Sequence, residues 1–156
     1  MDLGNLVFQA EIHGVEVWIN HEANHELDVV AGGGAAIRAM LPEVGNASVV
    51  TERAVAVLGI SLVTTAPTDE VNFVVLHEIG HILSGHIAEG YRLISERDEP
   101  AADAVAMSLG ASPEAGIDFL KKAYQTFKTT EKSLLRRMWV WCMTEIRVHK
   151  LAKLIN

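Results

Sequence analysis

The sequence is nearly devoid of cysteine, with Cys142 as its single thiol among 156 residues. One thiol cannot form an intrachain disulfide, and zinc sites built from several cysteines are excluded. Long apolar runs are also missing. The two longest, at 55–66 and from 71 onward, are too short or too interrupted by polar residues to cross a bilayer. We therefore expect no membrane-spanning segment.

Basic residues are in the minority, since 13 Lys and Arg stand against 20 Asp and Glu and leave a net charge of −7. Affinity for nucleic acid comes mainly from Lys and Arg on phosphates, so no nucleic-acid partner is expected. Some basic residues gather late in the chain, where we expect them to form the solvated face of a helix. They are Arg136, Arg137, Arg147, Lys150 and Lys153.

The N-terminus has neither the basic start nor the apolar core of a signal peptide, so we expect a cytoplasmic protein. No linker, low-complexity stretch or internal repeat divides the chain. Apolar residues make up 49% of it, the proportion typical of a chain that buries a core. These features predict one domain over residues 1–156.

The N-terminal part of the chain favours β-structure. Residues 6–12 and 15–19 alternate in part around a His-Gly pair and predict a β-hairpin. Residues 49–63 are rich in β-branched side chains and predict one or two strands with a bend at Gly59. Residues 22–41 stay ambiguous, because their run of three glycines disfavours a helix.

Four helices are predicted in the remainder, where apolar residues recur at helical spacing and Ser112-Pro113-Glu114 marks a helix start. A small N-terminal sheet followed by helices predicts an α+β fold, with the sheet packed on the first helix. The helices are expected from Thr68 or Asp69 to about His86, from Glu99 to Leu109, from Pro113 to about Phe127, and from about Thr130 to Leu154.

The first of these helices carries two histidines four positions apart, His77 and His81. Residues at this spacing lie on one face, so both imidazoles can reach one ion at about 2.0–2.1 Å. Glu78 lies about 100° around the helix from His77, where it can stay off the metal and act as a base beside bound water. This His-Glu-x-x-His spacing predicts a catalytic zinc site.

The same spacing occurs a second time, at His21 and His25. This copy follows a predicted strand, contains Asn24 and runs into the three glycines, whereas the copy at His77 and His81 lies within an apolar-periodic helix. Metal ligands need a rigid platform, so we place the site on the later copy.

A carboxylate at the start of the next helix can complete the ligand set. Glu99 would give two histidines and one glutamate and leave a position for water, as catalytic zinc requires. Asp103, one turn further along, can accept the free ring N–H of a zinc-bound histidine. Glu99 is also a favourable helix-start residue without any metal, and Glu96 and Asp98 compete with it as ligands.

Together these residues resemble a known family of enzymes. His77-Glu78-Ile79-Gly80-His81 followed by Glu99-x-x-x-Asp103 is similar to the gluzincin peptidases, and most similar to the branch containing HtpX and the CAAX prenyl proteases. The resemblance covers about residues 70–150. It implies a minimal zincin-like fold and a zinc held by His77, His81 and the Glu99 of the Glu-x-x-x-Asp motif.

Near the end of the chain, Met143 to Val148 is similar to the arginine motif of that branch, which implies an active-site role for Arg147. Trp141-Cys142 replaces the His-Pro pair found before that motif. The soluble and compact IrrE/ImmA-type metallopeptidases are a second family that the chain resembles.

The expected reaction is hydrolysis of a protein or peptide substrate, with Glu78 taking a proton from water and passing it to the leaving amine. Donors for the developing oxyanion stay open among Tyr91, Arg147, His149 and His86. His86 is expected to cap the helix or to support a ligand from outside, rather than to bind the metal itself. An edge strand at residues 60–65 is expected to pair with the substrate backbone.

Other classes of function stay open. The chain can be a non-catalytic zinc-binding or regulatory module, an inactive relative of peptidases, although a structural zinc has no need of Glu78. It can cleave one specific partner in a regulatory system. A metal-free scaffold with two chance motifs is the third alternative. The apolar C-terminal helix also fits a homodimer.

Overall fold

The protein has the mixed α+β architecture that the sequence predicts, with a four-stranded sheet and six helical segments among its described residues. The computed structural model describes residues 5–91 and 97–156. The strands are β1 (Leu6–Ile12), β2 (Val15–Asn20), β3 (Gly34–Glu43) and β4 (Asn46–Gly59). The helices are the π-helical turn η1 (Glu26–Val30), α1 (Ile60–Thr65), α2 (Thr68–Leu83), α3 (Glu99–Ser108), α4 (Pro113–Thr130) and α5 (Leu134–Ala152).

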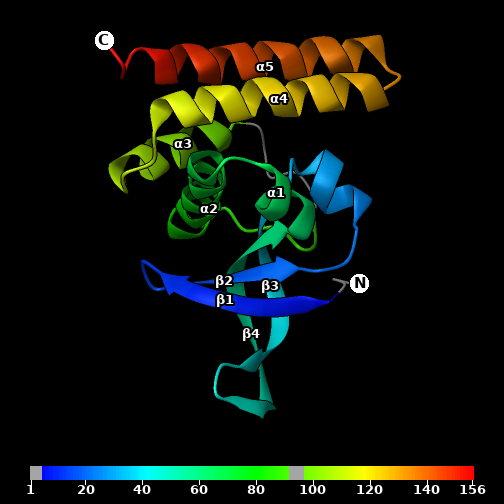
Figure 1. Cartoon of the computed structure of the whole chain (residues 1–156), viewed down its shortest axis with the longest axis vertical. Coiled ribbons are helices and arrows are strands. Elements are labelled where there is room, and N and C mark those ends of the chain that lie inside the picture. The colour runs from blue at the N-terminus through cyan, green and yellow to red at the C-terminus, as the bar shows by residue number, and fades with distance from the viewer. Residues whose placement is uncertain (1–4, 92–96) are drawn as a thin grey trace.

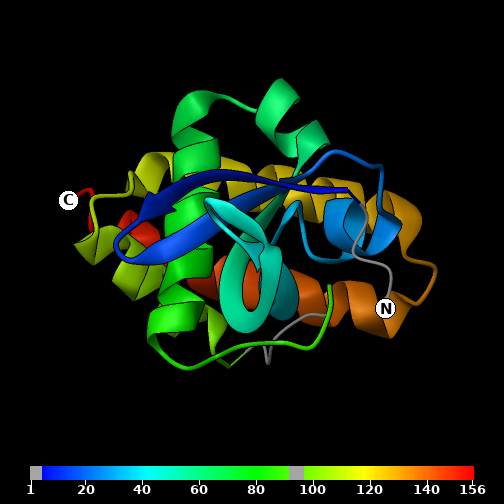
Figure 2. The same cartoon turned by 90° about the horizontal axis from the view of Figure 1, so that it is seen from below.

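The elements form successive layers, as Figure 1 shows. The sheet lies on one side, α2 and α3 lie beside it, and α4 and α5 form an antiparallel helical hairpin on the far side. Viewed from below, α2 runs across the sheet strands (Figure 2). Each helix within the described residues is too short or too polar to cross a lipid bilayer.

The sheet has the order β1-β2-β4-β3. The predicted hairpin of β1 and β2 is confirmed, and it turns at His13 and Gly14, whose φ angles are 51° and 75°. β2 then pairs in parallel with β4, and β3 pairs antiparallel with β4. β3 is therefore an edge strand, and its outer side receives Ala88, whose amide donates to the carbonyl of Ala36 at 3.0 Å.

The three consecutive glycines connect η1 to β3. Gly32 and Gly33 have φ angles of 69° and 94°, which side chains other than glycine rarely adopt. The amide of Gly59, at the end of β4, donates to the carbonyl of Gly33 at 2.9 Å and closes this turn against the sheet. The segment whose structure is ambiguous in the sequence is thus a π-helical turn, a glycine turn and a strand.

The prediction that residues 60–65 form a strand is wrong. β4 is one long strand that ends at Gly59, and Ile60–Thr65 is the helix α1. The hydroxyls of Thr64 and Thr65 donate to the carbonyls of Ile60 and Ser61 at 2.8 and 2.7 Å, a bond that threonine can make inside a helix. Local β-propensity is overridden here, so no edge strand for substrate exists at this position.

The four predicted long helices are present, with shifted ends. α2 stops at Leu83 rather than near His86, because Gly85 takes a φ of 77° that a right-handed helix cannot continue through. α4 begins as predicted, with the Ser112 hydroxyl accepting from the Ala115 amide at 3.1 Å. α4 ends at Thr130 and α5 begins after a second serine cap at Ser133.

α2 is the central element of the fold. Its Phe73, Val74 and Ile79 are almost completely buried against β2, β4 and the neighbouring helices. Burying a large apolar side chain contributes about 1.5–3 kcal/mol, so these three residues fix α2 firmly in place. A side chain carried by this helix therefore has a rigid support.

Candidate metal centre

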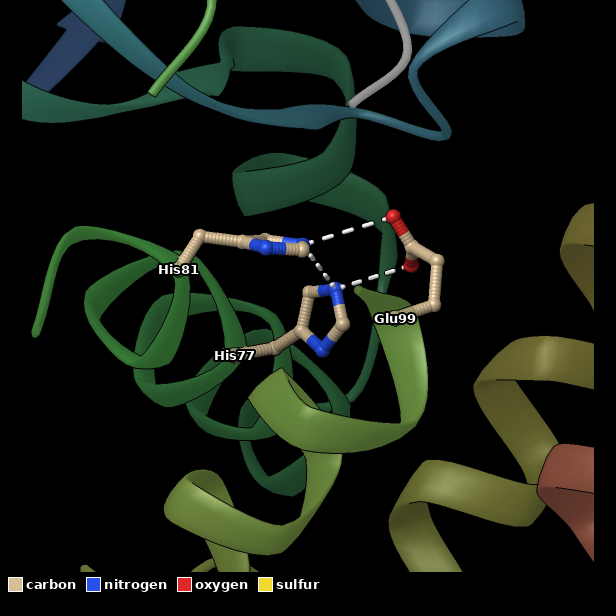
Figure 3. Close-up of side chains that lie close together, drawn as sticks. All are labelled: His77, His81 and Glu99. Carbon is tan, nitrogen blue, oxygen red and sulfur yellow. Dashed lines mark hydrogen bonds and ion pairs between the residues drawn. The ribbon is translucent and has the colours of Figure 1, made fainter. Parts of the chain in front are cut away.

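The two histidines of α2 lie one above the other and face the same point (Figure 3). Both are buried, and their Nε2 atoms are 3.1 Å apart. The ring of Phe73, one turn earlier, stacks on His77 with a centroid separation of 5.9 Å. Gly116 of α4 leaves room for that ring, since a Cβ there would lie 2.6 Å from it. The His77 ring is thus held by packing as well as by its helix.

Glu99 reaches the histidines from the first turn of α3 (Figure 3). Its two carboxylate oxygens lie 3.1 Å from Nε2 of His77 and 3.3 Å from Nε2 of His81. Gly80 makes this approach possible, because a Cβ at that position would lie 2.7 Å from the carbonyl oxygen of Ala102 in α3. The glycine inside the His-Glu-x-x-His stretch lets α3 pack directly on α2.

These three residues form a group that could hold a metal ion, because one donor atom from each lies within 4.8 Å of the others. The spacing can be tested against coordination chemistry. Ligands about 2.0–2.1 Å from a tetrahedral ion lie about 3.3–3.4 Å from one another. The separations of 3.1 to 3.3 Å come close to that value, so His77, His81 and Glu99 fit an ion with one further position open.

Asp103 lies one turn after Glu99 and approaches the other side of the His77 ring. Its Oδ1 is 2.9 Å from Nδ1 of His77, a short separation in which the ring N–H does not point squarely at the oxygen. Burial acts to raise the pKa of Asp103, but Arg147 and His77 lower it to about 2. Asp103 therefore stays ionised, and it would keep a proton on Nδ1 of His77 if an ion took the place of the proton on Nε2.

Arg147 enters the centre from α5 and binds both carboxylates. Its Nε and Nη2 donate to Asp103 at 2.7 and 2.8 Å, and its Nη1 lies 2.8 Å from Glu99. Burial acts to lower the pKa of the guanidinium, yet the two carboxylates raise it overall. The prediction that Arg147 lies on a solvated helix face is wrong, because the turn of α5 that carries it faces α3.

The charged groups of the centre shift one another's pKa values. Burial acts to raise the pKa of Glu99, but His77, His81 and Arg147 hold it well below its usual range. Burial would lower the pKa of His77, whereas Asp103 and Glu99 raise it to about 10. Two ionised carboxylates thus face two histidine rings and one guanidinium, and they favour the proton-bearing, charged form of His77.

Glu78 is buried beside this group and is not one of its three members. Its Oε1 would lie 2.9 Å from a Cβ at Gly34, and Val74 would lie closer still. Only glycine at the start of β3 therefore leaves room for this carboxylate. Burial raises the pKa of Glu78 above its ordinary value. The side chain is suited to take up a proton.

A cavity of about 150 Å³ adjoins the centre, and Glu78, His77, His81, Glu99 and Arg147 form its polar end. Apolar side chains form the rest of its wall. They come from η1, the start of β3, α4 and α5, and include Val29, Val30, Phe119, Phe127, Val140 and Met143. The cavity therefore joins a charged end to an apolar chamber.

The other candidates are not members of the ligand group. Asp98 is 3.5 Å from Nε2 of His86, whose ring lies edge-on to His81 at a centroid separation of 5.9 Å, so His86 flanks the ligand group without being one of its three members. The hydroxyl of Tyr91 is buried and accepts from the side chain of Asn20 at 3.3 Å. His149 is exposed on α5, and of the four candidate oxyanion donors Arg147 is the one that lines the cavity. Glu96 lies outside the described residues.

The second His-Glu-x-x-His copy does not form a site. His21 and His25 are both exposed, and the residues between them adopt no helix that would align the rings. Asn24 instead binds η1, where its side chain accepts from the amide of Leu27 at 3.1 Å. The structure thus agrees with placing the metal centre on α2.

Two glycines shape the candidate site and were not predicted from the sequence. Gly34 and Gly80 give room to Glu78 and α3, and both were visible in the sequence, one in the glycine run and one inside the motif. The apolar wall of the cavity was also missed, because its members come from four elements. No periodicity within one segment indicates such a wall.

Comparison with models of protein families, with curated proteins and with solved structures finds no match.

Proposed function

We propose that the protein is a zinc-dependent peptidase of the zincin type, which hydrolyses peptide bonds. One observation carries the proposal: three donor atoms at near-tetrahedral spacing open on the same cavity as a buried glutamate that is not needed as a ligand. A structural metal site has four protein ligands, whereas a catalytic site has three and an open position. The α+β arrangement, with α2 and α3 supplying the ligands, supports a minimal zincin-like fold.

Zinc is the ion we assign, because two imidazoles and one carboxylate are a common catalytic ligand set for it. When bound, zinc supplies a Lewis acid that lowers the pKa of water and polarises a carbonyl group. Magnesium and calcium favour all-oxygen ligand sets, which this centre does not offer.

Glu78 is the general base in this proposal. It takes one proton from the attacking water as the new C–O bond forms at the peptide carbonyl carbon. It then gives that proton to the leaving nitrogen as the C–N bond breaks, so the products are a carboxylic acid and an amine. The carboxylate can move protons because Gly34 and the helix hold it at the cavity without placing it among the ligands.

Arg147 and Asp103 are positioning residues. Nε, Nη1 and Nη2 of Arg147 each contact Asp103 or Glu99, so three of the five guanidinium N–H groups are directed at these two carboxylates. Arg147 holds Glu99 against the histidines and keeps Asp103 next to His77. We therefore assign Arg147 to shaping the ligand set rather than to contact with substrate.

The substrate is proposed to be a peptide with a bulky apolar side chain next to the scissile bond. The wall of the cavity away from the metal centre is mostly apolar, and its volume of about 150 Å³ is suited to a side chain such as leucine or phenylalanine. A charged side chain there would lose its hydration without gaining a partner.

The metal content of the purified protein tests the site, and the second motif copy provides a matched control. Wild type and His25→Ala are expected to hold about one zinc per chain, and His81→Ala to hold almost none. Zinc lost from His25→Ala and kept in His81→Ala would remove the proposed centre.

Peptide hydrolysis tests the chemistry separately. Zinc-loaded Glu78→Gln should keep its metal and cleave leucine- or phenylalanine-containing fluorogenic peptides at least about 100-fold more slowly than wild type, the usual scale of a general base. Equal zinc binding with no cleavage by wild type, across a library of unstructured peptides, would leave a non-catalytic zinc module as the function.

A further inference from the structure

α5 is the outermost helix of the molecule and has two different faces (Figure 1). It packs along α4 and touches α3 with one side. That side carries Arg147 into the metal centre and Val140 and Met143 into the cavity wall. The opposite side points away from the rest of the described chain. A surface helix normally presents polar residues on such a side.

The outward side of α5 is instead largely apolar. Six large apolar residues there have exposed fractions between 46% and 79%. We call them the α5 patch: Leu134, Leu135, Met138, Trp139, Trp141 and Ile146. With about 150–250 Å² for each residue, these fractions amount to roughly 500–900 Å² of exposed surface. The α5 patch is therefore at the upper limit for a monomeric protein.

The arginines of α5 are engaged elsewhere, and its one lysine, Lys150, is exposed one turn beyond the last patch residue, Ile146. Arg136 pairs with Glu131 at 3.2 Å and lies over the ring of Phe127, Arg137 is half-buried, and Arg147 is inside the centre. A helix that lies on an anionic membrane needs cationic side chains around its apolar face. Glu145, which is exposed on the outward side, adds a negative charge instead.

We propose that the α5 patch is the interface of a homodimer, in which α5 of one chain packs antiparallel on α5 of a second copy. A standard interface buries about 800 Å² on each partner, and the patch with its polar rim approaches that area. A two-fold axis brings the same patch of both chains together, so one contact covers both apolar surfaces.

The surface beside the patch is also suited to this partner. A hollow of about 310 Å³ between α4 and α5 is lined by Tyr124, Lys128, Leu134, Arg137, Met138 and Trp141. Large side chains that enter such hollows dominate the binding energy of interfaces. A tryptophan or leucine from the α5 patch of the second copy has the size to fill it.

The mass of the protein in solution tests the homodimer, and the proposal does not depend on the proposed peptidase activity. Light scattering after size exclusion at about 1–100 µM should give the dimer mass, which is twice the 17.0 kDa of one chain. Met138→Glu places a charge in the patch and should give the mass of a single chain. Met40→Glu, the same change at a residue of similar exposure on β3, should keep the dimer mass.

Cys142 lies near the middle of α5 on its outward side and provides a second readout. A short bismaleimide should link two copies through this single thiol in wild type and Met40→Glu, and fail to do so in Met138→Glu. Leu135→Glu should behave as Met138→Glu, and it decides the question if circular dichroism shows that Met138→Glu has not folded.

Three outcomes would overturn the homodimer. Wild type with the mass of a single chain over the whole concentration range excludes it. A dimer mass that Met40→Glu abolishes, or that both patch variants retain, places the interface elsewhere. A monomeric protein that sediments with phosphatidylcholine–phosphatidylglycerol vesicles, and loses this property in Met138→Glu, assigns the patch to a lipid surface.

Discussion

Asp103 connects two parts of the centre, since it contacts the outer nitrogen of His77 and accepts two hydrogen bonds from Arg147. Asp103→Asn keeps the size of the side chain but removes the charge that balances the guanidinium. Mutation of a residue that supports a metal ligand typically lowers metal affinity by 10–100-fold. We expect zinc affinity to fall by about that factor, as measured by competition with a chelating dye.

The chain offers a matched control for this prediction. Asp98 lies just before α3 and pairs with His86, which packs against the His81 ring but is not one of the three ligands. Asp98→Asn should therefore leave zinc affinity within about twofold of wild type, since it removes no contact to a ligand. Equal losses in the two variants would mean that charge near α3, rather than the contact with His77, controls binding.

At the scale of single residues, the sequence allowed the ligand group to be predicted but not its surroundings. His77, His81, Glu99 and Asp103 follow from the spacing of residues on two helices, and the structure brings these four together. The position of Arg147 depends on how α5 packs, 44 residues after Asp103. Spacing along the chain carries no such information, and the family resemblance alone indicated it.

The close contact between α2 and α3 can be tested by whether Gly80→Ala raises or lowers the free energy of unfolding. Gly80→Ala would stabilise an isolated helix by about 1 kcal/mol. In the folded protein its Cβ would lie 2.7 Å from the carbonyl oxygen of Ala102 and 3.2 Å from Val105. Such overpacking costs about 1–3 kcal/mol, so we expect a net loss of stability in urea unfolding. A variant more stable than wild type would show that α3 does not need this close approach.

At the scale of elements, structure that depends on neighbouring residues could be predicted from the sequence, whereas structure that depends on contacts between distant segments could not. The hairpin of β1 and β2 and the start of α4 depend on neighbouring residues, and both were predicted. The helix α1 was not, because isoleucine, valine and threonine favour strands unless their surroundings decide otherwise. The parallel pairing of β2 with β4 joins segments about 39 residues apart, which no local signal reports.

At the scale of the whole molecule, the metal centre joins α2, α3 and α5, so metal binding should stabilise the entire fold. A ligand at about 100 times its dissociation constant adds about 2.7 kcal/mol to the free energy of unfolding. For a chain of this size that corresponds to an increase in Tm of about 5–10 °C. Differential scanning fluorimetry of chelator-treated protein, with and without added zinc, measures it.

The two motif variants separate this effect from unspecific binding. His25→Ala should show the full increase in Tm, and His81→Ala should show almost none. A similar increase in both, and in wild type, would place the ion at another site. The α+β class itself follows from a sequence that places strands before helices, whereas the outward apolar side of α5 depends on which side α4 covers.

Arg147 has one more consequence, which concerns the order in which a ribosome makes the chain. Both histidines and both carboxylates are synthesised before α5, and Arg147 follows Asp103 by 44 residues. Until then, two acidic groups that will be buried together have no guanidinium beside them, and burying unpaired charges is strongly unfavourable. We therefore expect the complete group of carboxylates, histidines and guanidinium to form only after α5 has been made, so a nascent chain that lacks α5 should not carry the assembled candidate metal centre.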